Sequence, residues 1–175
     1  MTFHEVNLPG VREIRVERKP DERGFFTRCW CQEEFERNSL TARIAQCSIS
    51  FNVRKGTLRG LHYQTPPHAE TKIVRCTSGS IYDVVVDLRP DSPTFKDWTA
   101  VVLTAEKRNM LYVPEGCGHG FLTLEDNTEV FYQMSEFYNP QSARGVRWND
   151  PAFQIAWLSA PEVISERDRT YPDFE

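Results

Sequence analysis

Hydrophobic residues in this chain form short runs rich in β-branched and aromatic side chains, and turn residues separate the runs at regular intervals. Pairs such as Lys55-Gly56 and Ser78-Gly79 are typical of tight turns. Many short strands joined by turns are typical of an all-β sandwich or barrel. The predicted strands are Val11–Arg18, Phe25–Cys31, Ala42–Val53, Gly56–Gln64, Thr71–Cys76, Ser80–Leu88, Thr99–Leu103, Asn109–Val113, Gly120–Leu124 and Thr128–Ser135.

Helical signals are few. One short helix is predicted at Gln32–Arg37, where three glutamates favour the first turns through their charge. The polar stretch from Pro161 onward is expected to end in a helical turn or in an extended tail packed on the barrel. Because no linker interrupts the chain, residues 1–175 are expected to form one domain.

The composition is that of a globular protein, with 175 residues, 39% hydrophobic residues, 26% charged residues and a net charge of −4. Residues 1–75 carry 13 Lys and Arg against 9 Asp and Glu, whereas residues 76–175 carry 8 against 16. The overall charge argues against a nucleic-acid binder that relies on a globally basic surface. The basic first half still allows an anionic ligand to be held locally.

Targeting signals and disulfide patterns are not visible in the sequence. No apolar run approaches the roughly 18–20 residues of a membrane span, and the first residues lack the pattern of a secretory signal. The five cysteines are odd in number and include no C-x-x-C pair, so neither a disulfide framework nor a zinc knuckle is expected. Free thiols in a reducing cytoplasm are the simplest interpretation.

Two elements that contain histidine suggest a ligand site. The P-x-G-x-x-H motif that ends at His119 resembles an element of the cupin superfamily, which consists of jelly-roll barrels. Metal-binding cupins also carry an H-x-H element, but here Gln64 stands two residues after His62. The imidazole pair that would hold a transition metal is therefore broken, and no metal is expected. A set of His62, Glu70 and His119 remains the alternative for a metal-dependent enzyme.

Six sequence blocks occur in the order found in the dTDP-4-dehydrorhamnose 3,5-epimerase family, which the chain resembles over about Val11 to Asp168. The family's fold is a jelly roll, and its reaction uses neither a metal nor a cofactor. Its members are usually homodimers in which an N-terminal strand crosses to the partner. The blocks are Asp21–Phe26, Leu58–Gln64, Lys72–Cys76, Asp87–Phe95, Pro114–Phe121 and Tyr138–Pro140.

The resemblance implies epimerisation of a nucleotide-activated 4-keto-6-deoxyhexose through an enolate. A base and an acid must then lie on opposite faces of the sugar ring. His62 is the expected base, because an imidazole of near-neutral pKa can accept a proton from carbon. Asp168 matches the family's aspartate partner, which would hold the imidazole tautomer. Taken alone, His62 would be interpreted as a core histidine and Asp168 as a solvated tail charge.

Tyr132 is the acid that the resemblance implies, and Lys72 matches the lysine near the keto oxygen. Alternation places Val130, Tyr132 and Met134 on one strand face, which is apolar except for the phenol, as in a barrel interior. A cation at Lys72 would stabilise the developing oxyanion. The alternatives are a core tyrosine with a backbone partner and an exposed lysine at a strand end.

Further residues match family positions that contact substrate. Arg23 and Arg59 would bind the diphosphate, since guanidinium groups suit phosphate oxygens. His119 would hydrogen bond to the sugar, Tyr138 would stack on the base, and Arg167 would also contact substrate. Strict alternation would place Arg59 and His62 on opposite strand faces, so both serve one site only if the strand bulges or Arg59 lies at the mouth.

The nucleotide end departs from the family pattern. The family's F-x-E begins here at Phe26, but Arg28 replaces the glutamate, which reverses the charge. In the family's Q-x-N-x-S strand, Gln46 is retained and Ser48 replaces the asparagine. The base could therefore be thymine, uracil, cytosine or guanine, and epimerisation could involve C3, C5 or both. A non-catalytic sugar-binding module is the third alternative, although it would not need an acid and a base.

Overall fold

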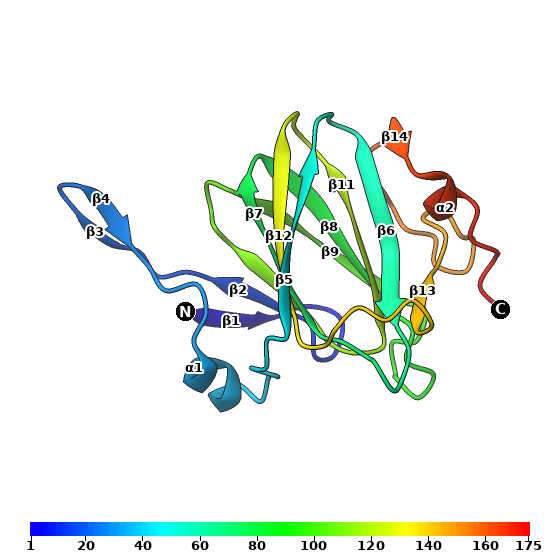
Figure 1. Cartoon of the computed structure of the whole chain (residues 1–175), viewed down its shortest axis with the longest axis horizontal. Coiled ribbons are helices and arrows are strands. Elements are labelled where there is room, and N and C mark those ends of the chain that lie inside the picture. Colours follow the sequence, from blue (N-terminus) through cyan, green and yellow to red (C-terminus); the bar gives the residue numbers. More distant parts are fainter.

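Two β-sheets make up most of the structure, a computed structural model that describes residues 1–175 (Figure 1). In the first sheet the strand order is β1 (Thr2–Glu5), β2 (Arg12–Arg15), β10 (Met110–Val113), β7 (Lys72–Ser78), β12 (Thr128–Met134) and β5 (Gln46–Asn52). In the second it is β13 (Ala143–Gly145), β6 (Thr57–Gln64), β11 (Cys117–Thr123), β8 (Ser80–Asp87) and β9 (Trp98–Thr104). A short strand, β14 (Val163–Ile164), pairs in parallel with β6. The arrangement confirms the predicted jelly roll.

The main hydrophobic core contains side chains from both sheets. Val74 on β7 and Leu111 on β10 meet Val85 on β8 and Phe121 on β11, and all four are fully buried. The inward positions alternate with outward ones along β5 and β12, as a sheet with one buried face requires. The two sheets therefore enclose an apolar centre. Polar side chains that face inward near the edges of the sheets are exceptions to this pattern.

The structure corrects the ends of several predicted elements. The helix α1 lies at Gln32–Arg37, as predicted. The strand predicted at Phe25–Cys31 is only β4 (Gly24–Phe26), because its partner β3 (Lys19–Asp21) is three residues long and offers no further backbone groups. The strand predicted from Ala42 begins at Gln46, where pairing with β12 begins. Strands β1, β3, β13 and β14 were not predicted.

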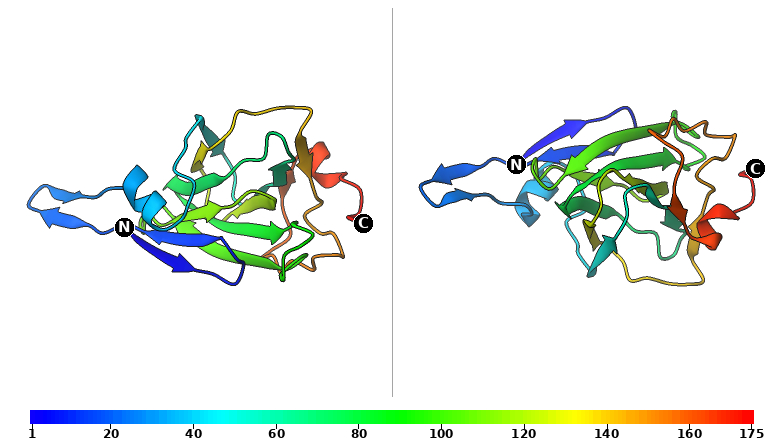
Figure 2. Two further views of the ribbon diagram at one scale, coloured as in Figure 1. Left: turned by 90° about the horizontal axis from the view of Figure 1, so that it is seen from below. Right: turned by 90° about the horizontal axis from the view of Figure 1, so that it is seen from above.

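The hairpin of β3 and β4 projects away from the two sheets, on the opposite side from β6 and the helix α2 (Glu166–Arg169) (Figures 1 and 2). Phe26, the last residue of β4, is 71% exposed. The C-terminal segment, in contrast, folds back along the second sheet and carries α2 against β6. No helix has the length and apolar character needed to cross a membrane.

Candidate active site

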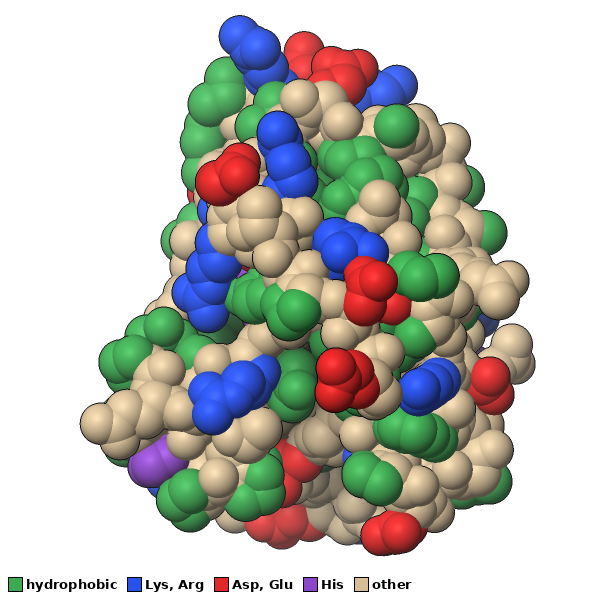
Figure 3. All heavy atoms as spheres, turned by 90° about the vertical axis from the view of Figure 1, so that its right-hand side faces the viewer, with side chains coloured by type: hydrophobic (Ala, Val, Ile, Leu, Met, Phe, Trp, Pro, Cys, Tyr) green, Lys and Arg blue, Asp and Glu red, His purple; other side chains and the backbone are tan.

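A pocket of about 650 Å³ lies between the two sheets. Strands β5, β7 and β12 of the first sheet contribute to its wall, β6 and β11 of the second sheet contribute the facing wall, and α2 closes one side. Figure 3 views the molecule from the side of α2 and β13 and shows Lys and Arg side chains gathered along one edge of that face. A concave site with a few convergent polar groups is the usual form of a small-molecule site.

A bulge in β6 brings Arg59 and His62 to the same pocket. In the pairing of β6 with β11, His62 lies opposite His119 and Arg59 opposite Phe121, so three steps on β6 match two on β11. Gly60, inside the bulge, has a φ of +129°, and a Cβ there would collide with Gly120 and lie 2.9 Å from the His119 carbonyl oxygen. The bulge therefore breaks the strict alternation of β6, so that the side chains of Arg59 and His62 can line the same pocket.

His62 and Asp168 form a hydrogen-bonded pair. Nε2 of His62 lies 2.6 Å from Oδ1 of Asp168, and the backbone N–H of Gly60 donates to Oδ2 at 3.2 Å. Burial alone would raise the pKa of Asp168, but these hydrogen bonds, led by that from His62, lower it below its ordinary value. Because an ionised carboxylate only accepts, Nε2 carries the proton and Nδ1 has the free lone pair of the neutral ring.

A second histidine–aspartate pair joins His119, which lines the pocket, to Asp83, which does not. Nε2 of His119 is 2.7 Å from Oδ1 of Asp83, and the two residues are 3% and 0% exposed. Oδ2 of Asp83 has no hydrogen-bond partner, which is unusual for a buried oxygen. Burial raises the pKa of Asp83, although His119 and Lys72 oppose the rise.

Tyr132 lies next to this second pair and faces the pocket. Its ring centroid is 5.9 Å from that of His119, in an edge-to-face arrangement. Burial and then the nearby Asp83 raise the pKa of the phenol well above its ordinary value, with Arg59 opposing them. The phenol therefore keeps its proton at neutral pH, at the wall of the pocket.

Lys72 begins β7 and lines the pocket from beside the base. Its ammonium group donates to the backbone carbonyl of His62 at 3.0 Å and forms an ion pair with Glu70 at 3.2 Å. The carboxylate of Glu70 therefore pairs with Lys72 and does not join His62 and His119 in a ligand set. No group of three His, Cys, Asp or Glu side chains is arranged to hold a metal ion. The alternative ligand set of His62, Glu70 and His119 is therefore not formed.

The arginines of the pocket are held by neutral partners. Nε of Arg59 donates to Oδ1 of the buried Asn52 at 2.7 Å. Nε of Arg167 donates to the hydroxyl of Tyr171 at 2.8 Å, and Tyr171 and then Tyr138 raise the pKa of Arg167. Neither guanidinium has a carboxylate partner, so both charges remain free to meet an anion.

The predicted site residues fall into three groups. Those that line the pocket are His62, Lys72, Tyr132, Asp168, Arg59, His119, Arg167 and Ser48. Gln46 and Tyr138 do not line it but contact each other, since the backbone N–H of Tyr138 donates to the side chain of Gln46 at 3.3 Å. The structure does not bring Arg23, Phe26 and Arg28 to the pocket of the same chain, because they lie on or just after the projecting hairpin.

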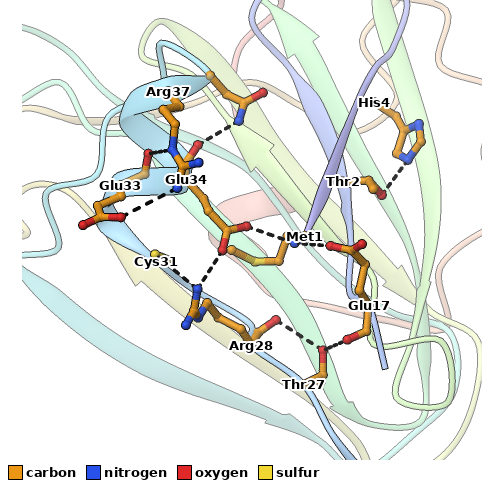
Figure 4. Close-up of polar contacts among 11 residues, drawn as sticks. Met1, Thr2, His4, Glu17, Thr27, Arg28, Cys31, Glu33, Glu34 and Arg37 are labelled. Atoms are coloured by element: carbon orange, nitrogen blue, oxygen red, sulfur yellow. Dashed lines mark hydrogen bonds and ion pairs between the residues drawn. The ribbon is translucent and has the colours of Figure 1, made fainter. Parts of the chain in front are cut away.

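Two of these three residues have partners close to their own positions. Arg23 forms an ion pair with Asp21 at 2.6 Å. Nη1 of Arg28 lies 3.0 Å from Glu34 on α1 and 3.8 Å from Sγ of Cys31 (Figure 4). The reversed charge at Arg28 is therefore compensated inside the chain by a glutamate of the next helix.

Sequence reasoning missed Asp83, Asn52 and Tyr171. A signal exists for Asp83, since it is the only charged residue between Ile81 and Val86 in a buried strand. A buried carboxylate needs a partner, and the pairing of β8 with β11 supplies His119. Asn52 and Tyr171 carry no such signal, because their roles depend on contacts with distant parts of the chain.

Comparisons with known proteins agree on one family. A family model described as dTDP-4-dehydrorhamnose 3,5-epimerase matches residues 5–175. Proteins of that name from Shigella flexneri and Mycobacterium tuberculosis are 42% and 40% identical; the alignments cover 96% and 100% of this chain and 93% and 88% of those proteins.

Solved structures show the same similarity in three dimensions. The Bacillus anthracis enzyme of this name, crystallised with TDP and PPi bound, has a TM-score of 0.94 at 38% identity, covering 99% of both chains. The Legionella pneumophila enzyme, in complex with dTDP-4-keto-L-rhamnose, has a TM-score of 0.89 at 32% identity, covering 95% of this chain and 89% of that one.

Proposed function

Because this chain belongs to the dTDP-4-dehydrorhamnose 3,5-epimerase family, we propose that it epimerises a nucleotide-linked 4-keto-6-deoxyhexose without a metal or a cofactor. The observation that carries the proposal is the placement of a base and an acid on opposite walls of one pocket. The base, His62 with Asp168, belongs to the second sheet and the helix beside it, and the acid, Tyr132, belongs to the first.

The proposed reaction begins with removal of a proton next to the keto group. Nδ1 of His62 accepts the proton from carbon, and the Asp168 carboxylate stabilises the resulting imidazolium. The electron pair moves to the keto oxygen, where the ammonium group of Lys72 stabilises the enolate. Tyr132 then protonates the carbon from the other face, and its raised pKa keeps the proton available until the enolate forms. Water takes the proton from the imidazolium of His62 and returns one to the phenolate of Tyr132, which restores both groups.

For the substrate, we propose a dTDP-linked sugar epimerised at both C3 and C5, as the names of the relatives indicate. Arg28 and Ser48 alter the part of the site that would contact the base, so a CDP-, UDP- or GDP-linked sugar is the alternative. Epimerisation at C3 alone would use the same residues. A panel of nucleotide sugars with product analysis distinguishes these cases.

The proposal is tested by incubating the protein with dTDP-4-dehydro-6-deoxyglucose in D₂O and measuring deuterium at C3 and C5. The wild-type protein is expected to incorporate deuterium at both carbons. His62→Ala should lower exchange by about 10²–10⁴-fold, since it removes a positioned base. Tyr132→Phe should retain proton removal but slow formation of the epimerised product. Binding without exchange, for several nucleotides, would instead indicate a non-catalytic sugar-binding module.

We also propose that the enzyme is a homodimer in which the β3–β4 hairpin of each chain reaches the pocket of the other. Strand β1 pairs with β2 of its own chain, so the projecting hairpin is the segment free to cross. The edge strand β5 exposes Ile49 and Phe51 on its outward face, and Val53 follows directly after the strand; each of the three is more than half exposed. A second copy would cover this face, and its hairpin would supply Arg23 and Phe26 to the pocket.

For the cellular location, we propose the cytoplasm. All five cysteines are free, and two of them are buried. Burial raises the pKa of Cys76 and of Cys117 to about 12, so both thiols stay protonated and unreactive at neutral pH. Protein with reduced cysteines is what a reducing compartment would maintain.

A further inference from the structure

Tyr171 follows α2 and contacts two functional residues, although it does not line the pocket itself. Its ring lies edge to face with the His62 ring, and the two centroids are 6.3 Å apart. Its hydroxyl accepts a hydrogen bond from Nε of Arg167 at 2.8 Å, and the guanidinium carbon lies 5.9 Å from the ring centroid. Tyr171 therefore joins the predicted base to a cation of the pocket wall.

The position of the Tyr171 ring depends on Gly145 in β13. A Cβ at Gly145 would collide with two ring carbons and the hydroxyl oxygen of Tyr171, so the hydroxyl end of the side chain lies directly against the glycine backbone. Gly145 is the register partner of His62 in the pairing of β13 with β6. The backbone carbonyl of Tyr171 also accepts a hydrogen bond from Arg147 at 3.3 Å. Backbone and ring are thus both held beside the strand that carries His62.

We propose that Tyr171 is a positioning residue that holds the Arg167 guanidinium ready for the diphosphate of the nucleotide sugar. This inference rests on the proposed function. Arg167 has no carboxylate partner, and only its Nε is used by Tyr171, which leaves the two terminal nitrogens for phosphate oxygens. A long exposed arginine loses rotamer entropy when it binds, and a side chain that is already held loses less. The hydroxyl of Tyr171 therefore increases affinity for the substrate.

The test measures the binding of dTDP by calorimetry alongside steady-state kinetics. Tyr171→Phe removes only the hydroxyl and should raise the Kd for dTDP about 3–10-fold, with KM rising in parallel and kcat within about twofold. Tyr82→Phe is the matched control, because its hydroxyl donates to the backbone carbonyl of Ala156 away from the pocket. A Kd that is unchanged in Tyr171→Phe would overturn the inference.

A double-mutant cycle shows whether the effect passes through Arg167. Arg167→Ala should weaken dTDP binding at least as much as Tyr171→Phe, and adding Tyr171→Phe to it should change nothing further. Fully additive effects would contradict a positioning role. If the wild-type protein binds dTDP but exchanges no deuterium, the proposed function fails and this cycle still decides the inference. If the wild-type protein exchanges deuterium but Tyr171→Phe binds normally, only the inference fails.

Discussion

Asp168 illustrates how one residue links stability and chemistry in this protein. The residue is 4% exposed, and the hydrogen bonds of its carboxylate with His62 and Gly60 lower its pKa below the ordinary value. A carboxyl group whose pKa is lower in the folded state stabilises the fold above its unfolded pKa of about 3.9. That contribution is lost as the pH falls through the folded pKa.

We therefore expect Asp168→Asn to lower the free energy of unfolding by about 1–3 kcal/mol at pH 7, since a buried charge-assisted hydrogen bond is removed. The difference from wild type should shrink as the pH falls below about 4, where the native carboxylate also becomes protonated. Urea unfolding between pH 7 and pH 3 measures both effects. Asp91→Asn, at an exposed turn, is the control. A difference that stays constant over this range would contradict the linkage.

At the scale of the secondary-structure elements, the bulge of β6 decides whether Arg59 and His62 can share a pocket. Gly60→Ala places a Cβ against Gly120 at a φ of +129°, so we expect a loss of about 2–4 kcal/mol in stability and a large loss of activity. Gly24→Ala is a close control, because Gly24 has a φ of +132° with no atom within 4 Å of the added Cβ. Equal losses of stability in the two variants would show that the close approach to Gly120 has no role.

Local patterns in the sequence predict the elements whose formation depends on local chemistry. The glutamate-rich start of α1 and the alternation along β12 both appear in the structure where they were predicted. The alternation around Tyr132 also placed its phenol toward the interior. Strands β3 and β14 are short, and their residues are polar or partly exposed. They form because partner strands offer backbone hydrogen-bonding groups, and the sequence of a single segment does not show that such a partner is present.

The candidate site could be predicted only as far as sequence motifs extend. The resemblance to the family predicted His62, Lys72, Tyr132 and Asp168, and the structure brings all four to one pocket, while their catalytic roles stay predictions. The role of Tyr171 could not be predicted, because it depends on contacts with Gly145 and with His62, which is 109 positions earlier in the chain. Long-range contacts of this kind follow from the topology and not from residue type.

For the molecule as a whole, the basic first half of the chain places its cations in two separate regions. Arg23 and Arg28 of the basic first half lie on or beside the projecting hairpin, whereas Arg59 and Lys72 line the pocket. Within one chain the β3–β4 hairpin projects from the sheets on the side opposite to β6 (Figure 1). A homodimer would bring the hairpin cations of one chain to the pocket cations of the other, so that one anionic nucleotide meets both.

A subunit-mixing experiment tests this arrangement. One chain carries His62→Ala, which inactivates its pocket, and the other carries Arg23→Ala with Phe26→Ala, which removes the hairpin contacts. Each variant alone should have little activity, because every site in either homodimer lacks one component. Random reassociation of separated subunits should make half of the dimers mixed, each with one complete site, and restore about a quarter of wild-type activity. If the hairpin variant is fully active alone, or if mixing restores nothing, each pocket is complete within its own chain or the hairpin does not cross.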